Sequence, residues 1–161
     1  MTLPSVGTGP VVVMGFGVTS EAVCRVLGDH GVAFVVLDDH PSPHARRRAD
    51  LLGVTIAETP TRTGLDAAMS DATAFLPSPG IPDQHPAFSA ARTAAVPVCS
   101  EFDLARDLDD RPIVAITGTD GKTTVTTLVG ACLAASGRVV AIAGNTEVPL
   151  VAAIADPEPE V

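Results

Sequence analysis

Along the first hundred residues, short runs of β-branched and other apolar residues alternate with longer segments in which apolar and polar residues are mixed. This alternation is typical of a parallel sheet covered by helices, and it predicts an α/β fold. The apolar runs predict strands at Val11–Met14, Phe34–Leu37, Val54–Ala57, Ala72–Leu76 and Val96–Cys99.

The segments between these runs predict helices. They are expected from about Thr19 to His30, over Leu65–Met69, and from about Pro86 to Ala94. Ser100 is a natural N-cap because Asp103 follows three residues later, as in a capping box. A further helix is therefore expected from Ser100 to Leu108.

The polar segment Leu108–Pro112 ends in proline and predicts a domain boundary near residue 110. Beyond it, strands are expected at Ile113–Ile116 and Val139–Ala143, with a helix between them from about Lys122 to Ala135 and a last short helix around Leu150–Ala155. Gly137 is a natural stop for the longer helix. About fifty residues are too few for an independent parallel sheet. We therefore predict a complete domain over residues 1–110 and the truncated start of a second α/β domain over residues 111–161, whose strands need partners outside this chain.

Composition narrows the possible partners. The net charge of −9 argues against nucleic acid and anionic membranes, because both favour a basic surface. The cysteines Cys24, Cys99 and Cys132 have no metal spacing, and we expect buried thiols in a reducing compartment. The first ten residues contain no Lys or Arg, and no apolar run reaches membrane-spanning length. We expect a cytoplasmic monomer.

The first glycine turn, Gly15–Ser20, follows a predicted strand and opens a predicted helix. Its Gly-x-Gly pattern, with Asp38 about twenty residues later, resembles a Rossmann-like dinucleotide fingerprint, although Ser20 stands at the third glycine position. The motif alone is compatible with a nucleotide diphosphate, an NAD-like cofactor, or a tight turn without a ligand.

The second glycine turn carries the chain's single lysine, Lys122. A strict Walker A pattern fails, because Ile116 stands where the first glycine would be. The turn still offers successive backbone N–H groups, a helix dipole, a lysine, and a Thr hydroxyl able to ligate Mg²⁺. It predicts a P-loop-type nucleoside triphosphate site rather than a solvated first-turn lysine.

Five motifs, in this order along the chain, resemble those of the Mur ligases. They are Gly15–Thr19, Ser78–Ile81, Ser100–Ala105, Ile116–Thr124 and Gly144–Asn145. The first two favour the glutamate-adding branch of the family. The resemblance implies an ATP-dependent amide ligase of peptidoglycan synthesis that joins D-glutamate to UDP-N-acetylmuramoyl-L-alanine through an acyl phosphate, with ATP and Mg²⁺ required.

The resemblance also implies residue roles. Substrate-binding positions would be Val18, Thr19, Asp38, Ser78, Pro79, Gly80 and Asn145. ATP-binding positions would be Gly118, Thr119, Asp120, Gly121, Lys122, Thr123 and Thr124. Lys122 would contact the β- and γ-phosphates as the catalytic cation, and Thr123 would ligate Mg²⁺.

Three positions depart from the family pattern. Asp120 and Glu147 add acids near the triphosphate, where like charges about 4 Å apart cost a few kcal/mol, and His40 replaces a basic residue. The family's remaining metal ligands and its D-glutamate domain would lie beyond Val161, so these residues alone are not expected to catalyse. Two alternatives stay open, a non-catalytic UDP-sugar or nucleotide-binding module and an NAD-dependent oxidoreductase domain.

The remaining charged residues suggest no site of their own. Arg46–Arg48 is interpreted as a solvated face at a helix start, although it could meet a diphosphate. His30, His44 and His85 have no ligand spacing.

Overall fold

A computed structural model describes residues 3–144 and 148–155 of the chain. Its centre is a parallel sheet in the order β3-β2-β1-β4, which confirms the predicted α/β class. The strands are β1 (Val11–Met14), β2 (Phe34–Asp38), β3 (Ile56–Glu58) and β4 (Ala74–Pro77).

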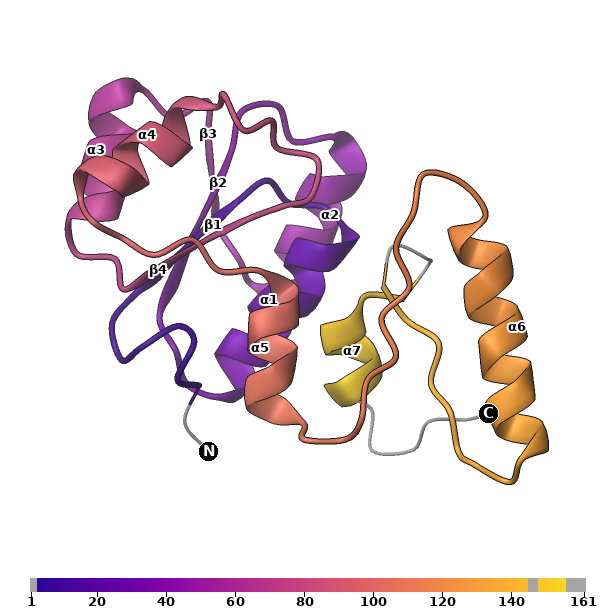
Figure 1. The fold of residues 1–161 in the computed structure, drawn as a ribbon. Coiled ribbons are helices and arrows are strands. Elements are labelled where there is room, and N and C mark those ends of the chain that lie inside the picture. Colours follow the sequence, from indigo (N-terminus) through magenta and orange to yellow (C-terminus); the bar gives the residue numbers. More distant parts are fainter. Residues whose placement is uncertain (1–2, 145–147, 156–161) are drawn as a thin grey trace.

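Helices cover both faces of this sheet (Figure 1). The helices that pack on the sheet are α1 (Val18–Asp29), α2 (Pro43–Leu52), α3 (Arg62–Ser70), α4 (Pro86–Thr93), α5 (Glu101–Leu108) and α7 (Leu150–Ala155). Helix α6 (Lys122–Ala135) covers neither face. Because side chains of a strand alternate between faces, Val11 and Val13 pack under α1, α2, α5 and α7, whereas Val12 and Met14 pack under α3 and α4.

The sheet β1–β4 and the helices α1–α5 are called the sheet domain below. The sequence patterns gave no range for one of its helices, α2. Only Ala45 and Ala49 of this helix are buried, so its apolar periodicity is weak. Its end signals are nevertheless present. Ser42 accepts a hydrogen bond from Ala45 N as the N-cap, and Gly53 ends the helix in the left-handed conformation at φ 67°.

The strand predicted at Val96–Cys99 is reduced to a single bridge between Val98 and Phe75 of β4. Phe75 N donates to Pro97 O, and Cys99 N donates to Phe75 O. Pro97 has no N–H to extend the ladder, which accounts for the shortened pairing.

The strands predicted at Ile113–Ile116 and Val139–Ala143 are wrong, because neither segment forms a strand in the structure. Helix α6, by contrast, has the predicted bounds, and Gly137 follows it in the left-handed conformation. Gly130 is the one buried residue of α6, lying beneath Ile142. A β-ladder requires a neighbouring strand, and the described residues supply none here.

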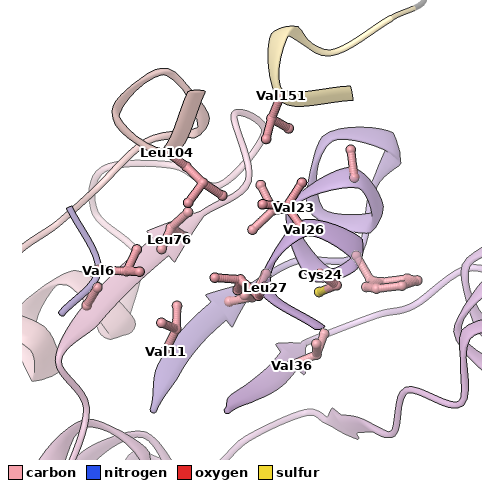
Figure 2. Packing of buried hydrophobic residues seen from close by; sticks show 14 of the residues in the cluster. Val6, Val11, Val23, Cys24, Val26, Leu27, Val36, Leu76, Leu104 and Val151 are labelled. Atoms are coloured by element: carbon pink, nitrogen blue, oxygen red, sulfur yellow. The ribbon is translucent and has the colours of Figure 1, made fainter. Parts of the chain in front are cut away.

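Helix α7 packs on the sheet domain although it follows α6 in sequence. Val151 is fully buried and joins the cluster that contains Val23 and Val26 of α1 and Leu104 of α5 (Figure 2). The carboxylate of Glu101, at the start of α5, is buried beside the first turn of α7. The division of the chain at residue 110 stays a prediction.

The predicted burial of the cysteines holds for only one of the three. Cys24 is buried in the core under α1, and burial raises the pKa of its thiol to about 12. Cys99 is half-buried, and Cys132 is exposed because α6 itself is exposed. No helix in the described part of the chain is long and apolar enough to cross a membrane.

Candidate functional site

The carboxyl ends of the strands gather several of the predicted site residues at one edge of the sheet. Strand β1 passes through Gly15–Gly17 directly into α1. Gly15 has φ +82°, and a Cβ there would lie 3.0 Å from Ser78 Cβ and 3.2 Å from Ile81 Cδ1. The segment after β4 therefore lies against the glycine turn, and only glycine fits between them without strain.

Asp38 organises this turn from the end of β2. Its Oδ2 accepts a hydrogen bond of 2.8 Å from Phe16 N, and its Oδ1 accepts one of 2.9 Å from His40 N. Both carboxylate oxygens thus hold backbone N–H groups. Asp38 can still receive a further donor, because a carboxylate has about four acceptor positions.

The first turn of α1 offers backbone donors at the same edge. The N-cap residue is Gly17, which makes no side-chain cap, and the first helical hydrogen bond runs from Glu21 N to Gly17 O. The N–H groups of Val18 and Thr19 precede that bond, and both residues are at least partly exposed. Such a helix start attracts anions.

The segment after β4 forms a wall beside this helix start. Ser78 N donates to Met14 O at 2.7 Å, which ties the segment to the end of β1. Pro79 and Gly80 are exposed, and Ile81 N closes a turn by donating to Ser78 O.

Arg48 reaches the glycine turn from α2. Its Nη2 lies 3.4 Å from Phe16 O, and its Nε lies 3.2 Å from Glu21 Oε2. The interpretation of Arg46–Arg48 as a solvated face is therefore wrong for Arg48, which is half-buried. It holds for Arg46, which forms an exposed two-bond pair with Glu58 and lowers the pKa of that carboxyl.

His85 also contributes to this edge, although its sequence surroundings suggested no site. Its Nε2 lies 2.8 Å from Asp39 Oδ2, at the end of β2. Its Nδ1 accepts from Ala87 N at 3.2 Å, so His85 is the side-chain N-cap of α4. The available sequence signal was Pro86, which often occupies the first position of a helix and so marks the residue before it as the cap.

The second predicted group lies at the start of α6. Gly121 is the N-cap, with φ 74° and no side-chain cap, so the N–H groups of the first turn are available to a ligand. Lys122 Nζ donates to Gly118 O at 2.5 Å and to Thr119 O at 3.2 Å. All the residues of Gly118–Thr124 are exposed.

This loop fits the phosphates of ATP, because it combines uncapped helix N–H groups with an ammonium above the loop carbonyls. Within residues 3–144 and 148–155, no three His, Cys, Asp or Glu residues form a metal cluster. A Mg²⁺ ion would therefore depend on the Thr123 hydroxyl and on phosphate oxygens, as is common for this ion. The predicted residues Asn145 and Glu147 lie outside the described residues.

The opposite edge of the sheet has an open hollow of about 400 Å³. It is lined by Phe34, Val35, Gly53, Val54, Thr55 and Ala57. This lining carries no charged side chain and none of the predicted site residues. Ligands of open parallel sheets bind at the carboxyl ends of the strands, which is the edge where the predicted residues Asp38 and Ser78 lie.

Two family models cover most of the chain. Residues 9–100 match the Mur ligase MurD-like N-terminal domain, and residues 116–157 match the Mur ligase middle domain. The chain belongs to the Mur ligase family. Both glycine turns described above lie inside these matched ranges.

Relatives support this membership. A UDP-N-acetylmuramoylalanine–D-glutamate ligase from Syntrophus aciditrophicus is 36% identical over 149 residues, which cover 92% of this chain and 33% of the relative. The protein of the same name from Frankia casuarinae is 39% identical over 151 residues, covering 93% of this chain and 32% of the relative. This Mur ligase chain thus spans about a third of the length of these relatives.

A solved Mur ligase shares the fold. The UDP-N-acetylmuramate:L-alanyl-gamma-D-glutamyl-meso-diaminopimelate ligase from Neisseria meningitides superposes with a TM-score of 0.55 at 18% identity. The match covers 88% of this chain and 46% of the solved one.

Proposed function

We propose that this chain provides the UDP-substrate domain and the first ATP-binding elements of a cytoplasmic ligase. The ligase joins D-glutamate to UDP-N-acetylmuramoyl-L-alanine in peptidoglycan synthesis and forms ADP. The single observation that carries the proposal is the meeting of the glycine turn, Asp38 and the Ser78–Gly80 wall at one sheet edge. The names and similarity of the relatives support the choice of substrate.

At the sheet edge, each element has a task that its geometry suits. The N–H groups of Val18 and Thr19 bind the diphosphate, because the uncapped helix start carries partial positive charge. Asp38 holds the turn that presents these donors. The Ser78–Gly80 wall limits the space left for the nucleoside. Because the net charge of the chain is −9, the overall field does not attract an anion, and the N-terminus of α1 has to do so locally.

At α6, the loop positions the triphosphate. Lys122, whose Nζ donates to the Gly118 carbonyl, would contact the β- and γ-phosphates, and Thr123 would hold Mg²⁺, which would supply neutralisation of the phosphate charge. The alanyl carboxylate attacks the γ-phosphorus and ADP leaves. The amine of D-glutamate then displaces phosphate from the acyl phosphate and gives the amide. Positioning and charge neutralisation are the protein's main contributions.

Two measurements on the 161-residue chain test the proposal: calorimetric titration gives the Kd of a ligand, and thermal unfolding gives its effect on stability. We expect UDP-N-acetylmuramoyl-L-alanine to bind and to raise the free energy of unfolding, by about 2.7 kcal/mol at a hundred times its Kd. NADH is the control ligand and should leave the melting temperature unchanged. Stabilisation by NADH instead of the UDP substrate would favour an oxidoreductase domain and overturn the proposal.

ATP separates the ligase from a non-catalytic UDP-sugar-binding module. The ligase proposal requires ATP to bind at Gly118–Thr124, whereas a module that only holds the UDP sugar needs no triphosphate.

Asp120 in this loop is exposed, so solvent screens its repulsion of the phosphates. We expect Asp120→Asn to tighten ATP binding about threefold, with Asp110→Asn, an exposed acid outside the loop, as the control. Equal ATP affinities of wild type and Asp120→Asn would exclude the repulsion.

A further inference from the structure

The segment between β4 and α4, Ser78–His85, is attached at three points: at Ser78, through the half-buried Ile81 side chain that packs on the core, and at His85. Ser78 N is bonded to Met14 O at one end, and two local turns follow, from Ile81 N to Ser78 O and from His85 N to Pro82 O. Most residues between the ends are exposed. A segment with few buried contacts opens readily unless its ends are fixed.

The far end of this segment is fixed by His85, and the hydrogen-bond pattern assigns its tautomer. Nδ1 accepts from Ala87 N, so Nδ1 carries no proton and Nε2 carries the hydrogen. Nε2–H then donates to Asp39 Oδ2 at 2.8 Å. The imidazole side chain is 13% exposed and the Asp39 side chain 40% exposed, so water reaches the carboxylate but has little access to the ring. One ring thus caps α4 and ties its start to β2.

Asp39 is itself held in place. Its backbone O accepts from Thr59 Oγ1 at 2.9 Å, and Thr59 N donates to the neighbouring Asp38 O. Thr59 has φ 46°, an uncommon conformation for a β-branched residue. These bonds connect the ends of β2 and β3, so Asp39 is a fixed point for the His85 ring.

We propose that the His85–Asp39 pair is a positioning pair. It holds the Ser78–His85 segment, which begins with the Ser78–Gly80 wall, against the glycine turn and so sets affinity for the UDP part of the substrate. The inference rests on the proposed function. The pair joins the wall to the same β2 end that carries Asp38, and Asp38 holds Phe16 N of the turn. The three parts of the sheet-edge site are therefore mechanically connected.

A double-mutant cycle with UDP as the titrated probe tests the pair. His85→Asn keeps an N-cap side chain but is too short to reach Asp39, and Asp39→Ala keeps the cap but removes the acceptor. Each is expected to weaken UDP binding about fivefold, and the double variant no further, because both remove one interaction. Asp39→Asn retains an acceptor for Nε2–H and should restore most of the affinity.

The control is His30→Asn, which changes a histidine bonded to Val26 O at the other end of the sheet and should leave UDP affinity unchanged. Additive losses in the cycle, or wild-type affinity in both single variants, would overturn the proposal.

Hydrogen exchange without ligand tests the positioning role of the His85–Asp39 pair independently of the proposed UDP-substrate binding. The amides of Ile81 and His85 close the two turns of the Ser78–His85 segment. They should exchange several-fold faster in His85→Asn and Asp39→Ala than in wild type. If wild type binds neither UDP nor UDP-N-acetylmuramoyl-L-alanine, the proposed function fails. Unchanged exchange at Ile81 and His85 in both variants would show that the pair does not hold the wall.

Discussion

The Phe16 backbone has both of its polar groups held by side chains from other elements. Asp38 of β2 accepts from its N–H, and Arg48 of α2 lies 3.4 Å from its carbonyl oxygen. These contacts fix the direction of the two peptide groups on either side of Phe16, within the Gly15–Gly17 turn. A turn fixed in this way presents its remaining N–H groups without reorganisation, which favours anion binding.

At the residue scale, Gly15→Ala tests the contact between the turn and the wall. Gly15 and Gly31 both have positive φ, but only Gly15 would place a Cβ close to other side chains. We expect Gly15→Ala to lower the free energy of unfolding by about 3 kcal/mol and Gly31→Ala by about 1 kcal/mol. Urea unfolding measures both, and equal losses would mean that the Ser78 and Ile81 contacts do not resist the added methyl group.

At the scale of elements, α7 is a short helix held by two different contacts. Val151 fills the cluster under α1 and α5 (Figure 2). The backbone N–H groups of Leu150 and Val151 interact with the buried carboxyl group of Glu101. A helix of one or two turns is not stable by itself in water. Its position on the sheet domain therefore depends on these contacts.

Val151→Ala measures the apolar contact of α7. Val151 is fully buried, whereas Val148 is 44% exposed just before the helix. Removing two buried methyl groups should lower the free energy of unfolding by about 2 kcal/mol, while Val148→Ala should change it by less than about 0.5 kcal/mol. Denaturant titration followed by circular dichroism gives both values. Losses of the same size would place Val151 outside the cooperative core.

Glu101 makes the stability of the molecule depend on pH. Burial raises the pKa of Glu101, and the hydrogen bonds from Val151 and Leu150 oppose that shift in part. An acid with a raised pKa binds its proton more tightly in the folded state, so its contribution to stability falls as pH rises from its unfolded pKa through its folded pKa.

Glu101→Gln removes this titration. We therefore expect the unfolding free energy of wild type, relative to that of Glu101→Gln, to decrease from pH 4 to pH 7. Urea unfolding at each pH measures the difference. An increase over this range would show that the α7 hydrogen bonds outweigh burial.

At the scale of the whole molecule, apolar exposure is uneven. The sheet domain buries both faces of β1, whereas the region after residue 111 exposes Ile113, Val114, Val125, Leu128, Val139, Ile142 and Val148. Relatives are about three times as long as this chain. The exposed residues belong to elements that the sequence predicted to need a larger sheet.

Hydrogen exchange should reflect this unevenness. Helix α1 contributes six buried residues and α6 only Gly130, so α6 amides should exchange at least tenfold faster than α1 amides. Equal protection of α1 and α6 would show that α6 is packed in solution.

Leu128, whose side chain is exposed (60%), and the buried Leu27 give a matched pair of variants. Leu128→Gln should change the free energy of unfolding by less than about 0.5 kcal/mol, while Leu27→Ala should lower it by at least about 2 kcal/mol.

The sequence by itself determined the features that depend on neighbouring residues. The bounds of α6, the Ser100–Asp103 capping box and the glycine turn between β1 and α1 follow from local end signals and apolar runs, and the structure has each of them. The same patterns predicted the parallel sheet, because strands separated by helices have few other arrangements.

Only the tertiary structure decided the features that depend on residues far apart in sequence. Arg48 meets Phe16 across 32 positions and His85 meets Asp39 across 46, which no local spacing encodes. Helix α7 joins the sheet domain for the same reason. The segments Ile113–Ile116 and Val139–Ala143 have strand-like sequences but form no strand, because a strand is completed by hydrogen bonds to a neighbour rather than by its own residues.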